Sequence, residues 1–142
     1  MAKSLAFKLA EISRHIYYDA TNDDIVVSKE IVSSRRKSGS TTTTATTQVA
    51  LDTFAHGTYT TARYIVSVTQ GSNYHSTEIV ISHNGTTADI LEYGEIMSGS
   101  ALATFAADIS GSNARLLITP ASTTSTVFKL SLIHISEPTR PY

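Results

Sequence analysis

The feature that most constrains this chain is a series of short apolar segments separated by small polar turns between residues 59 and 130. Apolar and polar residues alternate within the segments, which is typical of strands with one buried face. Asn84-Gly85 between two such segments is a strong hairpin signal. The predicted strands are 64–68, 78–82, 88–93, 102–109, 114–119 and 126–130, and the turns are 70–73, 83–86, 98–100 and 110–113. The pattern predicts an all-β fold, an antiparallel β-sandwich (jelly-roll-like or a meander) of about seven to eight strands.

The alternation also predicts which side chains face the core. Tyr64, Val66 and Val68 share one face of their strand, and Ile79 and Ile81 share one face of the next. Because the opposite faces are mixed or polar, we expect each sheet to be packed on one side only.

The overall composition fits one domain with a short arm. The chain has 142 residues, 16% of them charged, a net charge of −1 and no cysteine. Disulfides and thiol nucleophiles are therefore excluded, and no basic field is present to attract nucleic acid. No apolar run approaches the ~20 residues that a membrane span needs, so we expect no membrane insertion.

Residues 1–32 are predicted to form an N-terminal arm followed by a first strand at 25–32. Four apolar residues recur at spacings typical of one helical face, so the arm is expected to be helical up to residue 18, or else extended. These residues are Leu5, Leu9, Ile12 and Ile16. The arm either packs on its own domain or docks on a neighbouring subunit, and the sequence leaves both possibilities open.

Two further boundaries follow from composition. Residues 33–47 are rich in Ser and Thr and have little to bury, so we interpret them as a linker or exposed loop. Arg35-Arg36-Lys37 within it is read as solvated rather than as a phosphate or membrane contact. Residues 48–129 are the predicted sandwich domain, whose first strand is 48–54.

Residues 130–142 are predicted to be a non-native tail. Leu130–Arg140 resembles, without interruption, the translation of a transposase-based sequencing-library adapter, and Pro141 and Tyr142 are then further read-through. Residues 130–135 still alternate apolar and polar residues, so a strand there would not establish that the segment is native.

The histidines carry no recognisable metal motif. None sits at the spacing of a helical zinc pair, and no H-E-x-x-H pattern occurs. The five are His15, His56, His75, His83 and His134. His75 and His83 share a strand face but are eight residues apart, so we expect surface or turn histidines rather than a pair.

Acidic residues gather at two places without a catalytic pattern. One group spans a predicted hairpin: Glu78, Asp89, Glu92 and Glu95. We favour exposed acids there over the paired carboxylates of a glycosidase. The other group is Asp19, Asn22, Asp23 and Asp24. Its spacing fits a turn better than a calcium loop. We therefore expect no catalytic residue, no metal site and no cofactor.

Tyrosines offer the remaining candidate contacts. Tyr59, Tyr64, Tyr74 and Tyr93 could form an aromatic face for a sugar, although tyrosines half-buried at strand ends are the more common case. The candidate ligand contacts are Tyr74 and Tyr93.

Several segments together resemble a β-sandwich module of tailed-bacteriophage virion structural proteins, of the tail-fibre or neck-appendage type. These segments are Arg63–Thr69, Tyr74–His83, Asn84–Ala88, Ile90–Gly94, Ala107–Ser110 and Ala114–Pro120. The resemblance covers residues 48–129 and contains no catalytic motif.

The resemblance implies a non-enzymatic virion component that builds an appendage through subunit packing. It implies a homo-oligomer with other virion proteins as partners, and the arm would then serve assembly. The alternative is a module that binds carbohydrate on a host surface. An enzyme is a third possibility.

Overall fold

The computed structural model describes residues 16–19, 24–27 and 34–136, and within these ranges every regular element is a strand. The strands are β1 (Ile16–Asp19), β2 (Asp24–Val27), β3 (Ser34–Thr43), β4 (Val49–Ala55), β5 (Tyr59–Gln70), β6 (Asn73–His83), β7 (Ala88–Met97), β8 (Ala103–Ser110), β9 (Asn113–Pro120) and β10 (Thr126–Ser136). A helix long and apolar enough to cross a membrane is absent from the described residues.

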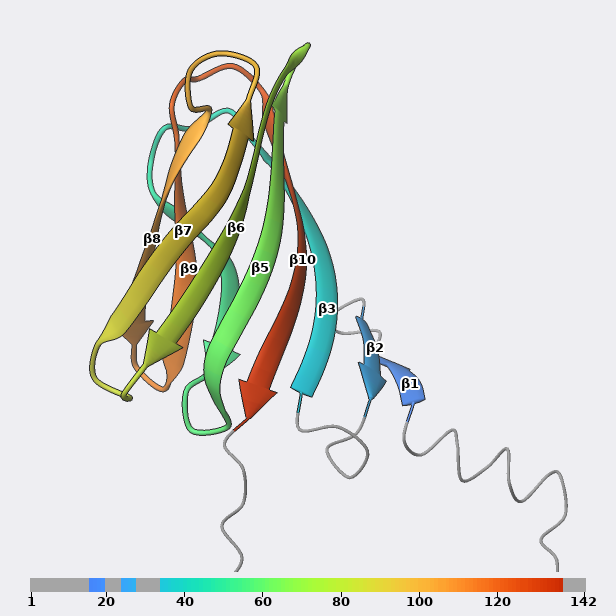
Figure 1. Cartoon of the computed structure of the whole chain (residues 1–142), viewed down its shortest axis with the longest axis vertical. Coiled ribbons are helices and arrows are strands. Elements are labelled where there is room, and N and C mark those ends of the chain that lie inside the picture. Colours follow the sequence, from blue (N-terminus) through green and yellow to red (C-terminus); the bar gives the residue numbers. More distant parts are fainter. Residues whose placement is uncertain (1–15, 20–23, 28–33, 137–142) are drawn as a thin grey trace, which may run out of the picture.

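Eight of the strands form two sheets that pack face to face (Figure 1). One sheet has the order β3-β10-β5-β6-β7 and the other β4-β9-β8, and all the pairs are antiparallel. Strands β1 and β2 form a separate hairpin, in which β2 lies next to β3. The predicted all-β antiparallel sandwich is confirmed.

The core lies between the sheets and uses the predicted faces. Tyr64, Val66 and Val68 of β5 are fully buried, and so are Ile79 and Ile81 of β6. The three-stranded sheet supplies the facing side chains of Phe54, Leu116 and Ile118. Phe128 of β10 adds to the core from the same sheet as β5, beside Val68. Each large apolar side chain contributes about 1.5–3 kcal/mol by leaving water, so strict alternation along β5 and β6 decides the facing of both strands.

The predicted turns lie where the chain reverses. Gly71 and Gly111 adopt φ values of 60° and 58° in the β5–β6 and β8–β9 hairpins. The hairpin predicted at Asn84-Gly85 is confirmed, with a loop of residues 84–87 between β6 and β7. The Asn84 side chain holds this loop, because its Oδ1 accepts hydrogen bonds from the backbone N–H groups of Thr86 and Thr87 at 2.9 and 2.8 Å.

The prediction of a linker at 33–47 is wrong for Ser34–Thr43, which form strand β3. All ten residues pair with β10, from Ser34 opposite Ile135 to Thr43 opposite Thr126. β3 is an edge strand, and edge strands commonly carry charged and hydroxyl side chains. Its backbone hydrogen bonds come from a partner about ninety residues away in sequence, which local composition does not reveal.

The predicted helical face is wrong at its last residue, Ile16. Ile16–Asp19 are extended and pair with Asp24–Val27, so the extended alternative holds for this part of the arm. β-branched and aromatic residues favour such pairing over a short, isolated helix. The rest of the predicted helix, at 1–15, lies outside the described residues, as does the 28–32 part of the predicted first strand.

Strand β10 crosses the predicted domain boundary at residue 129. It continues to Ser136, and Leu130, Leu132 and His134 point into the core with exposures of 6%, 2% and 0%. The alternation in 130–135 is sufficient to extend the strand, as the sequence suggested.

Candidate functional site

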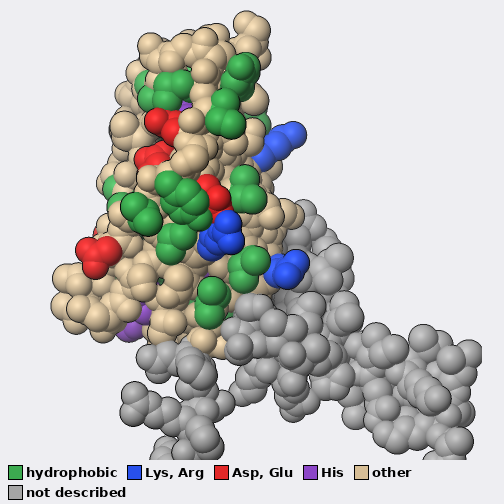
Figure 2. Space-filling view, in the orientation of Figure 1, with side chains coloured by type: hydrophobic (Ala, Val, Ile, Leu, Met, Phe, Trp, Pro, Cys, Tyr) green, Lys and Arg blue, Asp and Glu red, His purple; other side chains and the backbone are tan. Residues whose placement is uncertain are grey.

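The outer face of the five-stranded sheet carries apolar side chains from three neighbouring strands. Ile65 of β5 is 56% exposed, and Leu91 and Ile96 of β7 are 62% and 64% exposed. Half-buried Val80 of β6 pairs with Leu91, and Tyr93 of β7 is 38% exposed. We call these five residues the outer patch. Figure 2 shows hydrophobic side chains gathered on this face around acidic and basic ones. Single exposed apolar residues are normal, whereas a patch that crosses three strands is typical of an interaction surface.

A charged pair lies within the outer patch. The side chains of Arg63 on β5 and Glu78 on β6 form a hydrogen-bonded ion pair. Glu78 lies between Ile65 and Tyr93 in the sheet register, and Arg63 lies beside Val80. Two adjacent opposite charges are self-complementary, since a second copy related by a two-fold axis can place its carboxylate against this guanidinium.

The two candidate ligand contacts, Tyr74 and Tyr93, both lie on the outer face of the five-stranded sheet. They are 51% and 38% exposed. Tyr64 is instead fully buried, and its hydroxyl donates a hydrogen bond to Asp52. Tyr59 is half-buried and packs against the core. The four tyrosines therefore do not form one aromatic face, because the alternation of β5 directs Tyr64 inward.

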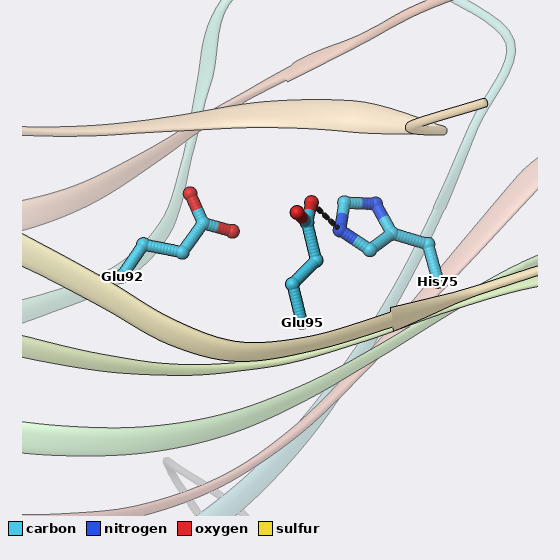
Figure 3. A group of neighbouring side chains, drawn as sticks. All are labelled: His75, Glu92 and Glu95. Atoms are coloured by element: carbon cyan, nitrogen blue, oxygen red, sulfur yellow. Dashed lines mark ion pairs between the residues drawn. The ribbon is translucent and has the colours of Figure 1, made fainter.

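A second cluster lies on the inner side of the same sheet, where β6 and β7 form its edge. His75 is 1% exposed, and its Nε2 lies 2.9 Å from Oε1 of Glu95. Ligand atoms of His75, Glu92 and Glu95 all lie within 4.8 Å of one another. Figure 3 shows both carboxylates on the side of β7 that faces the imidazole. The backbone N–H of Leu102 donates to Nδ1 of His75 at 3.3 Å. His83 lies at the far end of β6 and takes no part.

A β-bulge explains why the sequence did not single out this cluster. Strict alternation would place Glu92 and Glu95 on opposite faces, since they are three residues apart. The register of β6 and β7 shifts next to Gly94, which adopts a φ of 65° and brings both carboxylates to the inner side. Glu78 and Asp89 belong to the outer face, so the four acids do not converge. Gly94 inside a strand pattern was the available signal.

His56 and His83 hold loops at one end of the sandwich. His56 and His83 line a shallow hollow there, with ring centroids 5.9 Å apart. The Gly85 N–H donates to Nδ1 of His83 at 3.1 Å, and Nε2 of His83 donates to the Tyr59 carbonyl at 2.6 Å. Nε2 of His56 donates to the Gly111 carbonyl at 3.2 Å. These ring nitrogens bond to backbone groups, so we assign both residues a structural role. The expectation of surface or turn histidines is wrong for His75 and His134, which are 1% and 0% exposed because their strand positions face the core.

One carboxylate is buried in the core. Asp52 of β4 is 4% exposed, and its Oδ2 accepts hydrogen bonds from the Tyr64 hydroxyl at 3.0 Å and from Nε2 of His134 at 2.9 Å. Nζ of Lys37 lies 3.5 Å from Oδ1. Burial alone raises the pKa of Asp52, but His134, Lys37 and Tyr64 together hold it below the ordinary value of 3.8. Burial and the nearby carboxylate raise the pKa of Tyr64. Asp52 of the three-stranded sheet therefore forms buried polar contacts with Tyr64, His134 and Lys37 of the five-stranded sheet, and these contacts link the two sheets.

The residues weighed as a calcium site are only partly described. Asp19 and Asp24 are register partners in the β1–β2 hairpin, as a turn between them predicts. Asn22 and Asp23 lie outside the described residues. All three residues of the basic triplet lie in β3, and Lys37 faces Asp52.

No family model and no curated protein matches this chain. Three solved tailspike structures show a partial likeness to it, each with a TM-score below 0.5. The Acinetobacter phage vB_ApiP_P1 tailspike is 20% identical over 70% of this chain, with a TM-score of 0.49. The Acinetobacter baumannii phage AM24 tailspike is 6% identical over 80%, with a TM-score of 0.48. The tailspike gp49 of Acinetobacter baumannii bacteriophage Fri1, a capsular polysaccharide depolymerase, is 9% identical over 96%, with a TM-score of 0.38. This chain spans 21%, 28% and 22% of those proteins, respectively.

Proposed function

We propose that this chain is a non-enzymatic structural module of a tailed-bacteriophage particle that assembles with further copies of itself through the outer patch. The carrying observation is an apolar surface that crosses β5, β6 and β7 and surrounds the Arg63–Glu78 pair. The resemblance of residues 48–129 to virion β-sandwich modules supports a place in a tail fibre or neck appendage.

The chemistry of the outer patch favours a second copy as its occupant. Contiguous exposed apolar side chains gain free energy when another apolar surface covers them. The adjacent Arg63 and Glu78 allow the same surface to meet itself without leaving a charge unpaired. A non-enzymatic role is supported by His56 and His83, whose ring nitrogens bond to the backbone.

Replacing apolar side chains of the outer patch with charged ones tests this proposal. We expect the double variant Leu91→Lys/Ile96→Lys to dissociate at least tenfold more readily than the unchanged chain, because two lysines cannot be covered by an apolar surface without a desolvation cost. Sedimentation equilibrium over a range of concentrations measures the effect. Thr104→Lys, at an exposed position of β8 on the other sheet, is the matched control and should leave assembly unchanged.

A clean monomer of the unchanged chain at high concentration would contradict assembly through this face. The alternative is then a carbohydrate-binding module, favoured by the exposed rings of Tyr74 and Tyr93 on the same surface. In that case glycan binding should be measurable on an array and should weaken in Tyr74→Ala or Tyr93→Ala. Turnover of a polysaccharide by the unchanged chain would instead favour an enzyme.

We also propose that Leu130–Tyr142 are not native to the protein, on the strength of their adapter-like sequence. The inward positions 130 and 132 of β10 hold leucines that fill the core beside β5. A native continuation would then need apolar residues at both positions to keep the same packing. Sequencing of the source DNA across codon 130 checks this directly.

A further inference from the structure

The cluster of His75, Glu92 and Glu95 contains an unusual buried nitrogen. Nε2 of His75 is inaccessible to solvent and forms no directional hydrogen bond, although Oε1 of Glu95 lies 2.9 Å away. Buried polar atoms without a hydrogen bond are rare and call for an explanation. Figure 3 shows this nitrogen aimed at the space that the two carboxylates border.

Two carboxylates lie beside that nitrogen, and their mutual repulsion also favours a cation at this place. Glu92 and Glu95 place oxygens within 4.8 Å of it and of each other. Like charges at this separation repel, and the repulsion is relieved by a cation between them. The β-bulge at Gly94, whose φ is 65°, places the side chains of Glu92 and Glu95 on the same side of β7.

We propose that Nε2 of His75 and the carboxylates of Glu92 and Glu95 form a binding site for one divalent transition-metal cation of the zinc class. One imidazole with two carboxylates suits zinc or manganese, whereas calcium and magnesium prefer oxygen donors throughout. Three protein donors leave a further position for water. The cation would tie β6 to β7, the edge strand of its sheet.

Cation binding at Nε2 changes which ring nitrogen of His75 carries the proton. Because the Leu102 N–H donates to Nδ1, the proton of the neutral ring is on Nε2 in the metal-free chain. Ligation of a cation at Nε2 requires the other neutral tautomer, whose proton is on Nδ1, so the Leu102 N–H then loses its acceptor. The Leu102 amide, immediately before β8, is therefore a local reporter of binding.

Titration of the full chain with ZnCl₂ by calorimetry, in a non-chelating buffer, tests the site. We expect one zinc per chain and at least tenfold weaker binding in Glu92→Gln and in Glu95→Gln, both exposed positions whose substitution leaves the core intact. Asp89→Asn, on the outer face of the same strand, is the matched control and should bind zinc like the unchanged chain. In ¹H–¹⁵N spectra, the zinc concentration that half-saturates the unchanged chain should shift its Leu102 amide clearly, and should shift that of Glu95→Gln far less.

Two results would overturn the proposal. One is the absence of zinc binding. The other is equal binding by the two glutamine variants and the unchanged chain, which would indicate adventitious contacts elsewhere. The site lies on the opposite face of the sheet from the outer patch, so neither result bears on assembly.

Discussion

The variant Ile79→Asp is expected to lose most of its free energy of unfolding. Ile79 is 0% exposed at the centre of β6, and its side chain packs between the two sheets. An aspartate there would bury an unpaired charge in place of an apolar side chain, at a cost of about 4 kcal/mol or more. That is a large share of the about 5–15 kcal/mol by which domains are normally stable. Circular dichroism and urea titration would measure the loss.

Ile65→Asp provides the matched control for this variant. Ile65 lies on the adjacent strand β5 but points outward and is 56% exposed. The same substitution there leaves the new carboxylate in water, so the spectrum and the urea midpoint of dilute protein should stay close to those of the unchanged chain. An intact spectrum and midpoint in Ile79→Asp would mean that the assigned facing of β6 is wrong.

Removal of the buried carboxylate should give the second large effect. Asp52→Ala leaves the Tyr64 hydroxyl and Nε2 of His134 without their acceptor, and Lys37 without its counter-charge. Breaking a buried pair by deleting one partner costs about 3 kcal/mol, which urea titration at pH 7 would reveal. Asp108→Ala is the control, because Asp108 pairs with Arg115 at the surface and surface pairs contribute little.

The contribution of Asp52 to the free energy of unfolding should decrease as the pH falls. Its folded-state pKa lies below the ordinary value of 3.8, so its charged form stabilises the fold above that value. This contribution is lost as the pH falls through the lowered folded-state pKa. The stability difference between the unchanged chain and Asp52→Asn should therefore narrow in acid. A difference that stays constant from pH 7 to about pH 2 would contradict the lowered pKa.

Local pattern was sufficient to predict most strands and their facing. The alternation around Tyr64 and Ile79 places those side chains inward, because one buried face of a sheet requires a period of two. The residues at Asn84-Gly85 predict the hairpin because they accept its backbone geometry. Each of these inferences concerns residues within about ten positions of one another.

The pairing of segments that are distant in sequence could not be predicted from local patterns of apolar and polar residues. Ser34–Thr43 became a strand because β10 supplies its hydrogen bonds, although the segment itself is polar and poor in apolar side chains. The inward acids of the candidate metal site were hidden for a related reason. A bulge in β7 reverses the alternation after Tyr93, and its position depends on the register with β6.

Short-range pattern predicts an antiparallel β-sandwich, the inward faces of its strands and the turns between them, because these depend on side-chain polarity and on backbone freedom at nearby positions. Three features follow only from the folded arrangement: which strands pair, the contact of Asp52 in β4 with Tyr64 in β5, and the position of His75 opposite Glu92 and Glu95. The physical reason is that these contacts form across sheets and between strands, where packing and register act together over long sequence separations.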